Sequence, residues 1–177
     1  HGWGPSWLWA AAILGGAIAL RWPQMTESIW YDEYCRTRAY LNDQTVGTIL
    51  RHDVHNPLYN ALMFLWTGLF GDSELSIRTP SLLAGLASGA ALAAWAGRRF
   101  GAGTGWTLAA LVAASPVHVW YSGEAKNTMF VIATSVWALI AVDGLARERT
   151  RRAWVFALLA SAAAIWTDFV TALALAP

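Results

Sequence analysis

The 177-residue chain is 56% hydrophobic and only 13% charged, about half the charged fraction of an ordinary soluble domain. Its net charge of +1 gives no electrostatic basis for binding nucleic acid, and a single cysteine excludes an internal disulfide. The twelve tryptophans are typical of membrane–water interfaces. Together these properties predict an all-α, polytopic integral membrane helix bundle.

Five apolar segments predict the transmembrane helices. The first is uncharged, is flanked by tryptophans and is followed by Arg21, so with its flanks it reaches across about 30 Å of hydrocarbon. Alanine, glycine and serine are abundant in all five, as close helix packing in lipid requires. The segments are residues 6–20, 79–97, 104–115, 127–142 and 153–166.

A polar first loop, residues 23–77, separates the first two of these segments. It holds most of the acids, and short juxtamembrane helices are expected at 36–41 and 45–50. Asn56 and Pro57 then resemble a helix start, and Gly71 a helix stop. A helix over 57–70 is only about 21 Å long, which indicates an interfacial helix rather than a spanning one.

The arginines suggest an orientation. With a cytoplasmic N-terminus, the arginine-rich stretches 98–99 and 147–152 lie inside, and the first loop shares the outer face with residues 116–126. A competing arrangement lets 57–70 span the membrane. It places still more arginines inside but separates Asp32 from Glu124 by the bilayer. Helix length favours the first arrangement.

Several short stretches together resemble the C-type glycosyltransferase superfamily, closest to the branch that holds protein O-mannosyltransferases and lipid A aminoarabinose transferases. The first is an acidic first-loop motif, and the others resemble the "PPLYY", "LFG…RLPS" and "SP…YSQEAR" segments of that branch. They lie in the same order as in the family. The stretches are residues 30–33, 55–59, 69–74 with 78–81, and 115–116 with 121–126.

The resemblance implies a transferase that takes a sugar from a polyprenyl-phosphate donor and passes it to a hydroxyl or amine of a protein, lipid or glycan acceptor. Such a reaction needs a base for the acceptor and positive charge for the departing phosphate. Asp32 is the candidate base, and Glu33 would orient the acceptor or help to hold a metal. The candidate phosphate ligands are Lys126, Arg78 and His55. The candidate substrate-lining residues are Tyr59, Tyr121, Glu124, His118 and Asp168.

Each of these residues has an ordinary alternative. Asp32 and Glu33 occur in what is otherwise a solvated polar loop. Lys126 and Arg78 stand where basic side chains extend from a helix end to the interface. His55 fits a hydrogen-bonded loop histidine, and the aromatic pair at 120–121 fits an interfacial belt.

The chain is interpreted as the N-terminal part, residues 1–177, of one transmembrane glycosyltransferase domain in a bacterial inner membrane, with its site outside the cytoplasm. No cofactor is evident; a divalent metal near Asp32, Glu33 and His55 stays open, although no metal motif is present. Two other interpretations remain. One is a non-catalytic membrane protein that binds or moves a lipid-linked glycan. The other is an inactive family member, because Asn56 and Asn127 depart from the family pattern, as Lys126 also does at a position where the family has arginine.

Overall fold

Helices form all the regular structure in the part of the chain that the computed structural model describes, residues 6–35, 37, 40–41, 44–53 and 55–168. The all-α prediction is therefore confirmed for these residues. In chain order the helices are α1 (Ser6–Met25), α2 (Tyr31–Tyr34), α3 (Val46–His52), α4 (Pro57–Phe70), α5 (Glu74–Phe100), α6 (Ala102–Ala114), α7 (Pro116–Ser122), α8 (Thr128–Glu148) and α9 (Arg151–Thr167).

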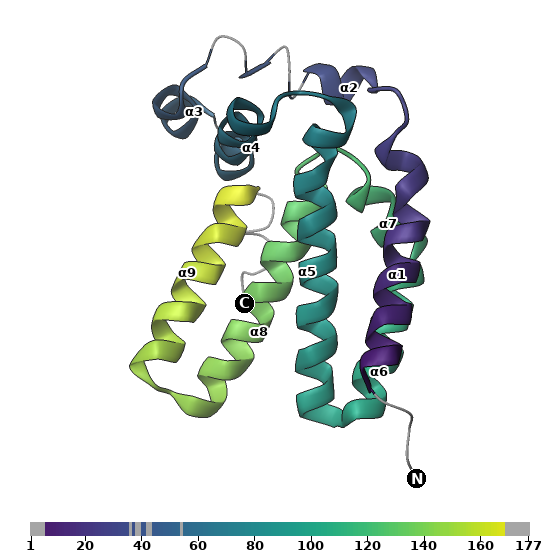
Figure 1. Cartoon of the computed structure of the whole chain (residues 1–177). Coiled ribbons are helices and arrows are strands. Elements are labelled where there is room, and N and C mark those ends of the chain that lie inside the picture. The colour runs from purple at the N-terminus through teal and green to yellow at the C-terminus, as the bar shows by residue number, and fades with distance from the viewer. Residues whose placement is uncertain (1–5, 36, 38–39, 42–43, 54, 169–177) are drawn as a thin grey trace.

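The long helices stand side by side, and the first-loop helices gather at one of their ends (Figure 1). Helices α5 and α6 form one antiparallel pair, α8 and α9 form a second, and α1 packs against α5 and α6. The α5–α6 and α8–α9 turns lie at the end of the bundle away from α2, α3 and α4. Helices α2, α3 and α4 and the stretch after α7 therefore share one end of the bundle.

Two helices of the described chain, α5 and α8, are long and apolar enough to cross a membrane by length and composition. Helix α5 contains the expected segment 79–97, and α8 contains the expected segment 127–142 except for its first residue, Asn127, which caps the helix. Helix α6, at 13 residues, and α9, at 17, are shorter than the roughly 20 residues that a perpendicular crossing requires. Helix α4 has 14 residues and ends at Gly71, as its sequence predicts.

Small side chains form the contacts inside the bundle, whereas large apolar side chains point outward. The buried positions of α5, α8 and α9 include Ala96, Ala138 and Ala164, while Leu139 and Leu159 are each more than 60% exposed. A water-soluble bundle buries its large apolar residues, so this inverted pattern fits a lipid surround.

The first-loop helices pack onto the end of the bundle through their own apolar core. Ile49 of α3, Tyr59 and Met63 of α4, and Ile77 of α5 are all buried in it. Helix α3 begins at a Thr45 cap, close to the expected helix at 45–50. The other expected short helix, at 36–41, includes positions outside the described residues.

Asp53 fixes the turn that leads into α4. Its carboxylate accepts the backbone N–H groups of His55, at 2.9 Å, and Asn56, at 3.0 Å, and also contacts Tyr40 and Asn60. Burial alone raises the pKa of Asp53, but these hydrogen bonds outweigh it and hold the pKa below its ordinary value. The carboxylate thus sets where α4 begins.

Gly105 sets how closely α5 and α6 approach. A Cβ at this position would lie 2.9 Å from the Ala93 carbonyl oxygen and 2.9 Å from Gly97 Cα, both backbone atoms. We therefore expect Gly105→Ala to destabilise the protein by about 1–3 kcal/mol in a detergent unfolding titration. Gly103→Ala on the same helix meets nothing within 4 Å and is the matched control. It should stabilise slightly, and equal losses in both would refute the packing argument.

Candidate active site at the first-loop end of the bundle

A buried ion pair joins the first loop to α5. Arg78 donates from Nε to Glu33 Oε1 at 3.0 Å and from a terminal nitrogen to Glu33 Oε2 at 2.7 Å. Both side chains are only 2% exposed. This two-point geometry fixes orientation as well as distance, and it fastens α2 against the first turns of α5.

The other N–H groups of Arg78 hold the chain between α1 and α2. They donate to the carbonyl oxygens of Gln24 at 2.7 Å, Glu27 at 2.6 Å and Ser28 at 3.1 Å. A guanidinium has five N–H groups, and all five are now used. Arg78, which the sequence suggested as a phosphate ligand, has no donor left for a substrate in this arrangement and acts as the anchor of the loop.

Glu33 is saturated in the same way. Besides Arg78 it accepts the backbone N–H of Ala125 at 2.8 Å and that of Trp30 at 3.1 Å. Burial alone raises the pKa of Glu33, but the Arg78 bonds and the two backbone donors hold it below its ordinary value. A carboxylate with four donors has no free oxygen lone pair directed at an acceptor or a metal. In this arrangement all four contacts of the Glu33 carboxylate are to the protein itself, whereas the sequence suggested that Glu33 orients the acceptor or helps to hold a metal.

This clamp brings Asp32 and Lys126 together. Asp32 precedes Glu33 and Lys126 follows Ala125, the two residues that the clamp joins. Lys126 Nζ lies 2.8 Å from Asp32 Oδ2, and the Asp32 side chain is 53% exposed whereas Lys126 is 29% exposed. The candidate base and the candidate phosphate ligand are thus neighbours at an accessible surface. The competing arrangement, with the bilayer between Asp32 and Glu124, does not fit this contact.

Exposed aromatic residues flank Asp32 in the sequence of the first loop. Trp30 meets Trp120 of α7 edge to face, with 6.4 Å between ring centroids, and Tyr31 and Tyr34 are also exposed. Such residues place flat apolar faces beside a charged pair, which suits both a sugar ring and a membrane interface.

A second polar cluster joins three helix ends. The Asn127 amide, before α8, donates to Asn56 Oδ1 at 2.7 Å and to Asp168 Oδ2 at 3.0 Å. Asn56 precedes α4, and Asp168 follows α9. In the sequence, Asn56 and Asn127 are two separate departures from the family pattern, and the structure brings them into contact. The presence of two amide side chains at two positions where the family has other residues was the only sign in the sequence that these positions are in contact.

With this geometry in place, comparison with known proteins decides the family. The model of the dolichyl-phosphate-mannose-protein mannosyltransferase family matches residues 54–177, which is well over half of the chain. The chain belongs to this family. No curated protein and no solved structure gave a match.

Membership in this mannosyltransferase family confirms the suspected relation to the C-type glycosyltransferases. It indicates a glycosyltransferase-type function and a membrane-associated protein. The match contains the stretches at 55–59, 69–74, 78–81 and 121–126 but begins after the Asp32 loop. Asp32 is tied to the family region by its contact with Lys126 and by the Glu33 clamp.

The other candidate site residues differ in how buried they are and in what they contact. Tyr59 is buried in the core against Phe130, with 5.2 Å between ring centroids, and does not face an open surface. His55 is exposed, whereas Tyr121 and Glu124 are half-buried. His118 is turned toward α1, where its Nδ1 lies 2.8 Å from an Arg21 nitrogen. Within the described residues, no three His, Cys, Asp or Glu side chains converge as metal ligands.

Proposed function

We propose that this chain forms part of a membrane glycosyltransferase that moves a sugar from a polyprenyl-phosphate donor to a hydroxyl or amine acceptor. Family membership supplies the reaction class. The observation that carries the rest is the contact between Asp32 and Lys126, at 2.8 Å on an exposed surface. A proton acceptor beside a cation is the pair of groups that displacement of a sugar phosphate requires.

In the proposed step the acceptor oxygen or nitrogen attacks the anomeric carbon. The new bond forms as the bond between that carbon and the phosphate oxygen breaks, and the phosphate leaves with the bonding electrons. Asp32 takes the acceptor proton, and Lys126 balances the charge on the phosphate. When Lys126 turns from Asp32 to the donor phosphate, the carboxylate loses its ion pair with Lys126 and becomes a stronger base.

Glu33 and Arg78 serve this reaction indirectly. They hold the peptide on both sides of the pair, because Glu33 bonds Ala125 and Arg78 bonds the carbonyls before α2. Geometry held within a fraction of an ångström is worth orders of magnitude in a displacement reaction.

We place the site outside the cytoplasm of a bacterial inner membrane, in a polytopic bundle whose first loop carries α2, α3 and α4. The distribution of charge supports this orientation. Arg98 and Arg99 and the arginines of 147–152 flank the two turns at the opposite end of the bundle. Arginine-rich turns stay in the cytoplasm, so the Asp32 end would face outward.

The test uses the purified protein in liposomes with polyprenyl-phosphate sugars that carry a radiolabel. Release of polyprenyl phosphate together with labelled acceptor establishes transfer. Movement of intact labelled donor between leaflets, with no transfer to peptide, glycolipid or amine acceptors, would reject the enzyme in favour of a protein that binds or moves the donor.

Lys126→Ala should raise the KM for the donor about 10- to 100-fold and leave the KM for the acceptor nearly unchanged. The expectation follows from the loss of one charged hydrogen bond to phosphate, about 1.5–3 kcal/mol. Lys126→Arg keeps the charge and should restore most of the donor affinity. An equal rise in the KM values for donor and acceptor would show that Lys126 does not bind the donor phosphate.

A further inference from the structure

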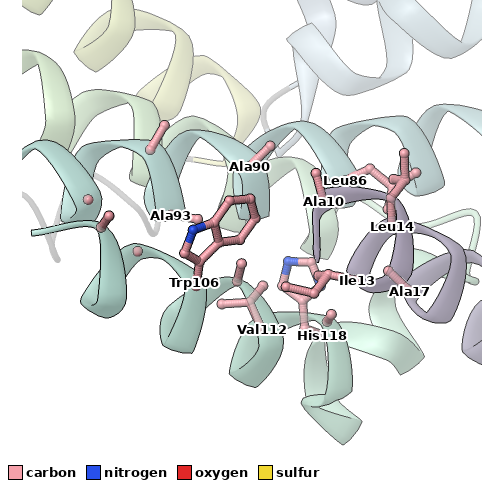
Figure 2. A pocket seen from close by; sticks show the side chains of 18 of the residues that line it. Ala10, Ile13, Leu14, Ala17, Leu86, Ala90, Ala93, Trp106, Val112 and His118 are labelled. Carbon is pink, nitrogen blue, oxygen red and sulfur yellow. The ribbon is translucent and has the colours of Figure 1, made fainter. Parts of the chain in front are cut away.

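A second site lies between the long helices, away from the Asp32–Lys126 pair. It is a half-open cavity of about 650 Å³, lined by α1, α5 and α6 and by His118 of α7 (Figure 2). Its walls are almost wholly apolar and mostly small. Figure 2 shows Ile13, Ala90, Ala93 and Trp106 around it, with His118 at the α7 side.

The shape of the cavity suits a hydrocarbon chain. Its lining residues on α5 extend from Gly85 to Arg98. At 1.5 Å per residue they cover about 20 Å along the helix, two-thirds of a bilayer's apolar thickness. A long apolar slot parallel to the helices of a membrane bundle accommodates one lipid chain rather than a compact solute.

One end of the cavity carries a buried positive charge. Arg21 of α1 is only 1% exposed and lines the cavity. One terminal nitrogen donates to the Ala17 and Ala113 carbonyl oxygens, at 2.8 and 3.1 Å, and the other to His118 Nδ1 at 2.8 Å. Its Nε–H is buried without a hydrogen-bond partner. No carboxylate of the described chain forms an ion pair with it.

His118 offers a second donor at the same end. A guanidinium only donates, so His118 Nδ1 must be the acceptor in the contact with Arg21, and the ring hydrogen is on Nε2. An unpaired buried cation is costly, and an anion placed against it removes that cost. A headgroup with a net negative charge neutralises Arg21, whereas a zwitterionic one leaves the total charge unchanged.

From these observations we propose that the cavity binds an anionic phospholipid, with one acyl chain between α1, α5 and α6 and its phosphate against Arg21 and His118. The site is separate from the transfer site. Arg21 lies about one helical turn before Gln24, whose carbonyl belongs to the Arg78 clamp, and Asp32 lies beyond that clamp. The bound lipid fills the seam between α1 and the α5–α6 pair and supplies the charge that Arg21 lacks.

The experiment is native mass spectrometry of the complete purified protein, titrated with phosphatidylglycerol. Ala109 lines the cavity, whereas Ala110, the next residue of α6, is exposed and does not. Ala109→Leu should reduce bound phosphatidylglycerol at least 10-fold, and Ala110→Leu should leave it unchanged. Arg21→Gln should lower the preference for phosphatidylglycerol over phosphatidylcholine at least 5-fold, and Arg21→Lys should retain it.

Several results would overturn the proposal. Equal binding of phosphatidylcholine and phosphatidylglycerol by the unmodified protein would remove the charge argument. A loss with Arg98→Gln instead of Arg21→Gln would put the headgroup at the wrong end. Displacement of phosphatidylglycerol by polyprenyl phosphate at equal concentration would assign the cavity to the donor. If no bound lipid is lost in Ala109→Leu, the cavity holds no lipid and is covered by other parts of the protein. None of these readouts requires transferase activity, so the lipid site and the proposed reaction can fail separately.

Discussion

Asp32→Asn should lower the rate of sugar transfer by about 10²- to 10⁴-fold, the range that a general base contributes. The amide has the same shape as the carboxylate but cannot take the acceptor proton. Asp32 is more than half exposed and its carboxylate is not part of the buried clamp, so expression and thermal stability should remain as in the unmodified protein. The measurement is transfer from polyprenyl-phosphate sugar at saturating donor and acceptor.

Glu27→Gln is the matched control for this variant. Glu27 is an exposed acid of the same loop, and the clamp uses only its backbone oxygen. Its replacement should leave the rate within about twofold of the unmodified protein, consistent with the small effects of exposed surface substitutions. If Asp32→Asn keeps full activity, Asp32 is not the base, and the half-buried Glu124 becomes the next carboxylate to test.

Local patterns in the sequence were sufficient for the helices that depend on local chemistry. The Asn56–Pro57 start and Gly71 stop of α4 follow from capping and backbone preference, and the structure has both. Apolar runs located α5 and α8 because lipid imposes length and composition on a spanning helix. Both the capping residues and the apolar runs depend only on residues that are close together in the sequence.

The partners of the charged residues were not predictable in this way. The sequence placed Glu33 beside Asp32 and Arg78 near a helix end, and both looked suited to bind substrate. Only the fold shows that these two bind each other, because they are 45 positions apart in the sequence and α3 and α4 lie between them. The same holds for Arg21, which resembles an interfacial flank in the sequence but is 1% exposed between α1, α6 and α7.

The Glu33–Arg78 pair carries the largest expected effect on stability. Arg78→Met would leave Glu33 as a buried carboxylate without its cation and would leave three carbonyl oxygens without donors. Removing one partner of a buried ion pair costs about 3–5 kcal/mol. We expect a loss of that size in the free energy of unfolding, measured by detergent titration. Arg99→Met is the control, since its pair with Asp143 is partly exposed and should cost at most about 1 kcal/mol.

The pH dependence separates the lost charge pair from a simple packing defect. The pKa of Glu33 is depressed in the folded protein, so its stabilising contribution is complete above the unfolded value of about 4.3 and is lost as the pH falls through the lower folded value. Without Arg78, burial dominates and raises the pKa of Glu33. In the Arg78→Met variant, protonation therefore removes the buried unpaired charge at a higher pH than in the unmodified protein. The stability gap between the two proteins should therefore narrow on acidification. A gap that stays constant from pH 7 to pH 4 would show that Arg78 acts through packing alone and not through the charge of Glu33.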